Sequence, residues 1–130
     1  MNLLDENVPL DQFDLLRARG IPCRVIGREV AESSIGDDNI VSLLHRLKHP
    51  TFFTRDEHFF KRRLCHKSYC LVWLDVAPEE AALFVQRFLR HSRFDTRAKR
   101  LGLVARAHHD GVHFWQRNRA ALQQAGWTES

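Results

Sequence analysis

The sequence predicts an α/β fold, a three-layer α/β/α sandwich around a mainly parallel central sheet. Two observations lead to this prediction. Short apolar runs of strand length alternate with segments of helical period as far as residue 91, which is typical of βαβ units with parallel strands. Beyond residue 100, two further apolar runs flank Asp110-Gly111, which predicts a C-terminal antiparallel hairpin at the sheet edge.

The first βαβ unit begins at an apolar run that stops abruptly at two carboxylates. Residues 3–4 are followed by Asp5 and Glu6, as expected of a buried strand that carries acids at its tip. Residues 9–19 repeat apolar side chains at helical spacing, between a proline that suits a helix start and a glycine that suits its end. Residues 23–27 then predict a second, parallel strand joined to the first by a right-handed crossover.

The middle of the chain predicts a helix and two strands. Residues 29–36 have no period and are expected to form a loop, after which Asp37 stands where a helix N-cap belongs. An apolar stripe to residue 47 completes that helix. Residues 51–54 predict a third strand with a short basic helix after it. Residues 69–74, the most apolar run in the chain, predict a central strand buried on both faces.

The last third predicts a helix and the terminal hairpin. Residues 78–91 carry acids in the first turn and bases in the last, which complements the helix dipole. Residues 93–100 are expected to form a basic loop. The hairpin follows over residues 101–107 and 112–115, and residues 116–130 are expected to form a short helix at best.

Composition restricts the class of protein. The chain has 130 residues and is expected to form a single domain, with its core in about residues 2–115 and a tail over residues 116–130. Its 44% hydrophobic and 28% charged residues exclude a disordered chain. No apolar run has the length of a membrane span and the N-terminus does not read as a signal peptide, so we expect a cytoplasmic protein with no membrane partner. Three cysteines without framework spacing suit reduced thiols.

Charge is unevenly distributed along the chain. The net charge is +4, with acids concentrated in the first 60 residues and bases in the second half. A basic surface beside an acidic strand tip suits a metal-dependent enzyme that acts on a phosphate chain such as RNA.

Three aspartates are the candidate catalytic residues: Asp5, Asp37 and Asp56. The carboxyl ends of parallel strands meet at one edge of a sheet, so these acids are expected to lie together. With Glu6 and Asp38 they are candidate ligands for Mg²⁺ or Mn²⁺, which prefer carboxylate oxygens. Such an ion can orient an attacking water, lower its pKa and neutralise charge on a phosphate. Alternatively, each acid could be only a helix cap or part of a turn.

A basic run follows the third aspartate. Arg55, Lys61, Arg62 and Arg63 are expected to flank the acids and to bind RNA phosphates. The alternative is a solvated surface, which is the usual role of a short basic run.

Three short motifs in this order resemble those of the PIN-like family of small ribonucleases, over about residues 2–76: Leu3-Leu4-Asp5-Glu6-Asn7, then Gly36-Asp37-Asp38-Asn39-Ile40, then Phe53-Thr54-Arg55-Asp56. The match is to a branch with an LLDEN opening and a T-R-D-x-D-F ending. The resemblance implies a PIN-like fold and Mg²⁺- or Mn²⁺-dependent endoribonuclease activity, often as the toxin of a toxin–antitoxin pair. It also implies a homodimer and a small antitoxin partner. Asp5, Asp37 and Asp56 match the family's acids, and Glu6 and Asn7 match the rest of the opening motif.

The chain departs from the family pattern at His58, where the family usually has a second aspartate. This departure leaves the fourth metal ligand open among Asp38, Glu57 and Asp75. It also leaves open a catalytically degenerate module that only binds protein or nucleic acid. An acidic pair with strand-end Asp75 is similar to a receiver domain as well, but such a domain needs a lysine near a late strand end, and residues 101–115 contain none.

Three aromatic residues near the C-terminus bear on assembly. Phe114, Trp115 and Trp127 are expected to be exposed and to suit a homodimer interface. Burial in the chain's own core is the alternative.

Overall fold

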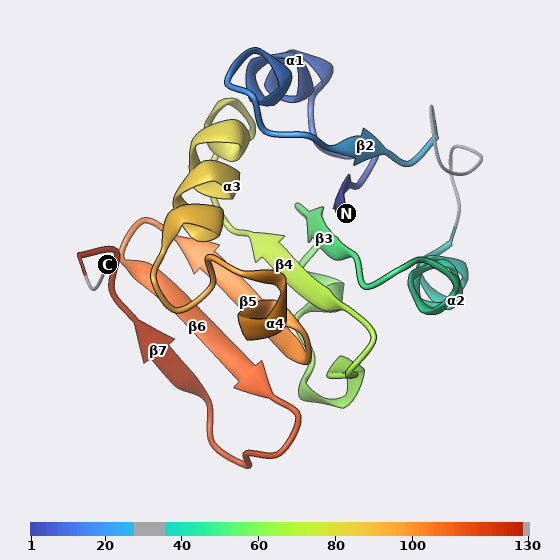
Figure 1. The fold of residues 1–130 in the computed structure, drawn as a ribbon, viewed down its shortest axis with the longest axis vertical. Coiled ribbons are helices and arrows are strands. Elements are labelled where there is room, and N and C mark those ends of the chain that lie inside the picture. The colour runs from blue at the N-terminus through green and yellow to red at the C-terminus, as the bar shows by residue number, and fades with distance from the viewer. Residues whose placement is uncertain (28–35, 129–130) are drawn as a thin grey trace.

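The computed structural model describes residues 1–27 and 36–128, and confirms an α/β fold around one mixed sheet (Figure 1). The sheet has seven strands in the order β2-β1-β3-β4-β5-β6-β7. Strands β2, β1, β3, β4 and β5 are parallel to one another. β6 pairs antiparallel with β5, and β7 pairs antiparallel with β6. The predicted mainly parallel sheet with a C-terminal antiparallel addition is therefore confirmed.

The elements have the following bounds. The strands are β1 (Asn2–Leu4), β2 (Arg24–Val25), β3 (Thr51–Thr54), β4 (Cys70–Leu74), β5 (Leu103–His108), β6 (Gly111–Gln116) and β7 (Gln123–Ala125). The α-helices are α1 (Leu10–Ala18), α2 (Asp37–Arg46), α3 (Ala81–Arg90) and α4 (Arg97–Arg100). Short 3₁₀ turns are η1 (Glu57–Phe59), η2 (Arg62–Leu64) and η3 (Pro78–Glu80).

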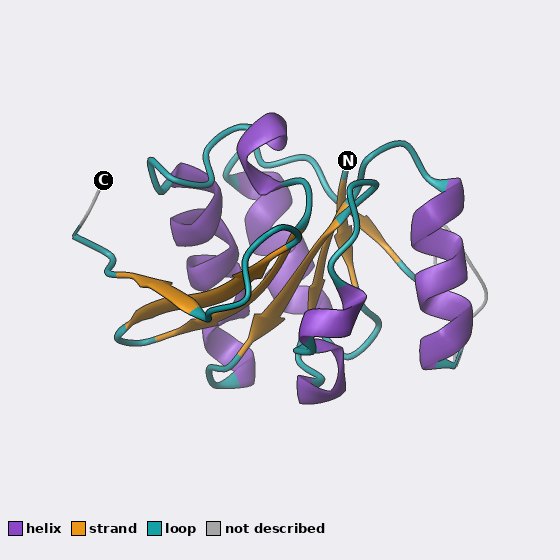
Figure 2. Ribbon diagram, turned by 90° about the horizontal axis from the view of Figure 1, so that it is seen from below, coloured by secondary structure: helices purple, strands orange, loops and turns teal. Residues whose placement is uncertain are grey.

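The helices cover both faces of the sheet, as the side-chain alternation along the strands requires (Figure 2). Leu4 and Phe53 pack in the cluster that contains the buried residues of α1 and α3. Their neighbours Leu3 and Phe52 point to the other face and pack in the cluster with α2 and η1. The predicted three layers are therefore present, with α1 and α3 on one face and α2 on the other.

The chain reverses its direction across the sheet between β1 and β3. From β1 it steps outward to the edge strand β2, and then returns past β1 to β3. The parallel order 2-1-3-4-5 is that of doubly wound sheets, in which ligands bind beyond the carboxyl ends of the strands at such a switch point. The β1–β3 pair is therefore the first place to look for a functional site.

The central strand prediction is confirmed by β4, which lies in the middle of the sheet and is almost wholly buried.

Aromatic rings fill the space between β3 and α3. Phe53 meets Phe88 at a centroid distance of 6.0 Å, and Phe88 stacks on Phe94 at 4.6 Å. This packing holds the α1–α3 layer on the sheet.

The predicted start of the second helix was one residue late. Gly36, in an extended conformation, is the N-cap of α2, and its carbonyl oxygen accepts a hydrogen bond from Ile40 N–H at 2.9 Å. Asp37 is therefore the first residue of the helix and not its cap. The rest of the predicted loop over residues 29–36 lies outside the described residues.

The C-terminal tail forms a strand where the sequence predicted a short helix at best. β7 pairs with β6 and becomes the sheet edge, so the predicted hairpin does not lie at the edge itself. The backbone groups of β6 would otherwise be unpaired on that side, and β7 satisfies them. Gly111 allows this approach, because its φ is +143° and a Cβ there would meet the backbone of Ala125. The predicted basic loop also differs, since it contains the short helix α4.

The three C-terminal aromatic residues are not exposed. Phe114 is 1% exposed and packs edge-on against Phe94 at a centroid distance of 5.3 Å. Trp115 and Trp127 pack against the two core clusters, and Trp127 donates its indole N–H to His108 O at 2.6 Å. The chain's own core therefore covers Phe114 fully and Trp115 and Trp127 in part, and the homodimer stays a prediction.

The three cysteines form no disulfide bond with one another, and burial raises the pKa of Cys70 to about 12. Among the described helices, none has the length and apolarity needed to cross a bilayer.

Candidate functional site

The candidate site lies at the carboxyl ends of β1 and β3. Asp5 directly follows β1, and its backbone N–H donates to Phe53 O at 2.9 Å, so the pairing with β3 continues one residue beyond β1. Thr54 is the last residue of β3. Asp5 and Thr54 follow Leu3 and Phe52 by two residues, so their side chains lie on the α2 face of the sheet.

The Asp5 carboxylate is buried and held by two hydrogen bonds. The side chain is 5% exposed. Oδ2 accepts the Thr54 hydroxyl at 2.7 Å, and Oδ1 accepts Glu6 N–H at 2.8 Å. Burial raises the pKa of Asp5, the negative charges of Glu6 and Asp56 raise it further, and the two hydrogen bonds oppose this shift. Asp5 is thus a buried acid with other negative charges close to it.

Thr54 connects the segment that follows β1 to the segment that follows β3. Its Oγ1 also accepts Asp56 N–H at 3.0 Å and the Asn7 side-chain amide at 3.3 Å. Asn7 Oδ1 in turn accepts Arg55 N–H at 3.1 Å. Our reading of the sequence gave Thr54 no role of its own. The signal available was a hydroxyl residue at the end of an apolar strand, directly before the acids.

Asp56 caps the turn that follows it, which is the structural role the sequence left open as an alternative. Its Oδ1 accepts His58 N–H at 2.9 Å, and His58 Nδ1 lies 2.8 Å from the same oxygen. His58 is 70% exposed at its side chain, compared with 27% for Asp56. The residue that departs from the PIN-like pattern is therefore in contact with the third aspartate.

The remaining candidate acids have no hydrogen bond to Asp5 or Thr54 in the described part of the structure. Asp38 and Glu57 are exposed, in α2 and η1. Asp75 follows β4, and its Oδ2 is bound by Arg106, at 2.8 Å from Nε and 2.7 Å from the second guanidinium nitrogen. Asp37 begins α2, and its side chain lies outside the described part of the structure. Among the described residues, no three Asp, Glu, His or Cys side chains come together as a metal site would require.

The basic residues divide between two places. Arg55 lies between Thr54 and Asp56, and its Nε is buried without a hydrogen-bond partner. Arg62 and Arg63 line a hollow with Gln116 at the amino ends of the parallel strands, because Gln116 pairs with Leu103 at the start of β5. They do not flank the acids as we expected, since the chain after η1 runs back toward the start of β4. Their role in nucleic-acid binding, and that of exposed Lys61, stays a prediction.

No protein-family model, curated protein sequence or solved structure matches this chain. The fold and the site together define an α/β protein with a buried aspartate at the switch point of a mainly parallel sheet.

Proposed function

We propose that this chain is a PIN-like endoribonuclease that depends on Mg²⁺ or Mn²⁺, with its active centre at Asp5, Thr54 and Asp56. The observation that carries the proposal is the buried Asp5 carboxylate at the β1–β3 switch point. Burying an acid costs free energy, and neighbouring negative charge increases that cost. Perturbed acids of this kind cluster at functional sites, and ligands of doubly wound sheets bind at this position.

The chemistry of the donors supports a hard divalent cation. The side-chain oxygens at this point are those of the Asp5 and Asp56 carboxylates and the Thr54 hydroxyl, and Mg²⁺ and Mn²⁺ prefer such oxygens to softer ligands. A cation would also relieve the repulsion from Glu6 and Asp56, which adds to the rise that burial causes in the pKa of Asp5. Asp5 and Asp56 would hold the ion, with Asp37, Glu6 and Asp38 as further candidate ligands. When bound, it would lower the pKa of an attacking water and neutralise charge on the phosphate.

The protein's own residues would orient this centre. Thr54 is a positioning residue, because its hydroxyl holds Asp5 while its oxygen fixes the Asp56 backbone. Arg55 is the candidate contact for an RNA phosphate, because it is partly exposed and stands between Thr54 and Asp56. A role as the toxin of a toxin–antitoxin pair, with a small antitoxin and a homodimeric form, belongs to the same proposal.

A second candidate function is a degenerate module that binds RNA without cutting it. The His58–Asp56 contact favours this alternative, because the backbone N–H and Nδ1 of His58 both lie against Oδ1 of Asp56, an oxygen that could otherwise bind a metal ion. A receiver-like domain has less support. The parallel strand order suits it, but the end of β5 carries His108 where a receiver site needs a lysine.

The proposal is tested first by titrating the protein with Mn²⁺ in a calorimeter. Asp5→Asn and Asp56→Asn should each weaken binding strongly, because each removes a charged ligand. Asp14→Asn, an exposed aspartate on α1, is the matched control and should bind as the native protein does. Circular dichroism establishes that each variant is folded. Unchanged binding heats for both site variants would contradict the assignment of the site.

Cleavage separates the enzyme from the binding module. The native protein should cut single-stranded RNA internally with Mn²⁺ or Mg²⁺, stop when EDTA is added, and lose activity in Asp5→Ala. RNA binding without cleavage under all of these conditions, and also in His58→Asp, would support the degenerate module instead.

A further inference from the structure

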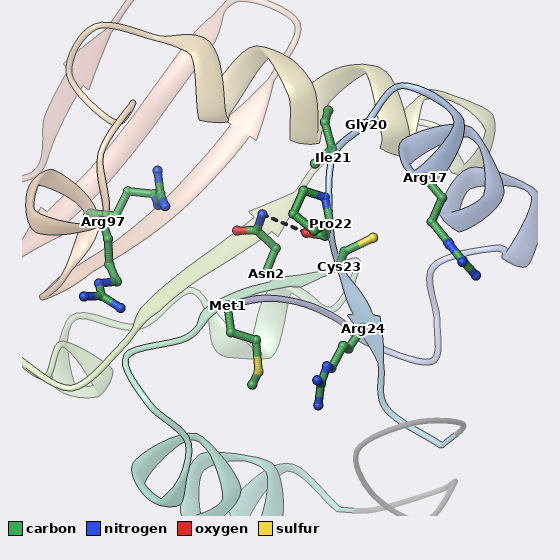
Figure 3. Close-up of a pocket in the computed structure, with 10 residues that line it drawn as sticks. Met1, Asn2, Arg17, Gly20, Ile21, Pro22, Cys23, Arg24 and Arg97 are labelled. Carbon is green, nitrogen blue, oxygen red and sulfur yellow. Dashed lines mark hydrogen bonds between the residues drawn. The ribbon is translucent and has the colours of Figure 1, made fainter.

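The amino edge of the parallel sheet, opposite the acids, is hollowed and basic. Its first hollow, of about 970 Å³, is lined by Arg17, Arg24, Arg97 and Arg100. Figure 3 shows that the lining comes from the start of β1, from the segment that runs from the end of α1 into β2, and from α4. Asn2 ties the first two of these segments together through a hydrogen bond from its side-chain amide to Pro22 O at 3.1 Å.

Two further hollows continue along the same edge. One is lined by Lys99, Arg117 and Arg119 together with the start of β5, and the other by Arg62, Arg63 and Arg117. Gln116 and Arg117 are shared by these two hollows, so the two are adjacent. Helix α4 contributes to both the first and second hollows, which places all three in a row.

The part of the chain that the structure describes brings little negative charge to this edge. Among the described residues that line the three hollows, none is an aspartate or a glutamate. Lys99 pairs with Asp95 at 2.8 Å, but Arg24, Arg97 and Arg117 are exposed and form no ion pair with any residue in the described ranges.

Arg100 lies deeper in the same edge and is held in place. It donates Nε–H to Thr51 Oγ1 at 3.0 Å and a terminal N–H to Phe94 O at 2.7 Å. Burial lowers the pKa of Arg100, and the charge of Arg97 acts in the same direction, although Asp95 and Cys70 oppose it. The exposed arginines therefore stand around a fixed, partly desolvated cation.

We infer that this amino edge is a binding face for the backbone of single-stranded nucleic acid. A phosphodiester chain repeats its negative charge along its length, and this edge offers exposed arginines in each of its three hollows. Guanidinium groups bind phosphate oxygens through two parallel hydrogen bonds. An acidic protein segment would need apolar anchors, which the first hollow offers at Met1, Ile21 and Pro22, whereas arginine, lysine and amide side chains line most of the other two.

This face is separate from the acid cluster. Asn2 lines the first hollow and Asp5 follows the other end of β1, so the two lie about 10 Å apart along the strand. Binding at the amino edge needs neither the metal nor the acids. Nucleic-acid binding at the amino edge can therefore be found in a protein that does not cleave RNA, and it can be missing from a protein that does.

The test measures binding of a fluorescein-labelled oligouridine by anisotropy, in EDTA, over a series of potassium chloride concentrations. The variant Arg24→Ala/Arg97→Ala/Arg117→Ala removes two exposed arginines of the first hollow and the exposed arginine that lines both the second and the third. The control Arg19→Ala/Arg46→Ala/Arg90→Ala removes the same net charge at exposed positions that line none of the three hollows. Circular dichroism establishes that both variants fold as the native protein does.

The edge variant should raise the dissociation constant about tenfold or more, and should reduce the slope of log K against log salt by about 2, because each lost phosphate contact on a single strand contributes about 0.7. The control should keep the native slope. Equal losses in both variants would show that net charge alone attracts RNA, and would overturn the inference. Binding of polyglutamate but not of oligouridine would also overturn it, in favour of an acidic protein partner.

Discussion

Replacing Thr54 with valine should lower the free energy of unfolding by about 3 kcal/mol near pH 7. The substitution keeps a β-branched side chain at the end of β3 and removes only the hydroxyl. Its hydrogen bond to the buried Asp5 carboxylate is charge-assisted, which contributes about 2 kcal/mol. The lost acceptor for Asp56 N–H contributes about 1 kcal/mol more.

The cost of this substitution should depend on pH. Burial already raises the pKa of Asp5, so ionised Asp5 destabilises the folded state, and this destabilisation grows as pH rises through the folded pKa. Without the Thr54 donor the pKa rises further. The difference between native protein and variant should therefore be largest near pH 7 and smaller at about pH 4, where Asp5 is increasingly protonated.

Urea unfolding, followed by the fluorescence of the three tryptophans, measures the free energy of unfolding of native protein and variant at each of the two pH values. Thr96→Val is the matched control. Thr96 caps the exposed helix α4 by accepting Lys99 N–H at 3.2 Å, so its loss should cost about 1 kcal/mol at either pH. A Thr54→Val cost that is equal at the two pH values, or no larger than that of Thr96→Val, would refute the proposed role of Thr54.

Two further predictions follow from contacts in the structure. His58→Asp removes the contact with Asp56 and adds a carboxylate, so Mn²⁺ affinity measured by calorimetry should rise about tenfold. If native protein is already active and the variant gains nothing, another acid completes the site. Gly111→Ala should detach β7, because its φ of +143° and the nearby Ala125 backbone leave no room for a Cβ. Hydrogen exchange at Gln123–Ala125 should then become fast, whereas unchanged protection would show that the β6–β7 edge adapts.

Local pattern in the sequence was enough to predict most elements up to residue 91. β3 was predicted at its observed bounds, because four apolar or β-branched residues stand between a proline and charged residues. The first helix was predicted within one residue at each end, since Pro9 fixes the backbone at its start and Gly20 allows the positive φ of 75° that follows its end. That Asp5 and Asp56 follow neighbouring strands was also predictable, because parallel strands present the same end at one edge.

Only the tertiary structure decided what these residues contact. The burial of Asp5 and its bond to Thr54 join residues 49 positions apart, and no local period reports such a pairing. β7 forms because β6 leaves an edge unpaired, which depends on the finished sheet and not on the preferences of residues 116–130. The basic amino edge likewise gathers arginines from segments far apart in the chain. Sequence spacing determines local conformation, whereas burial and charge clustering depend on which distant segments the fold brings together.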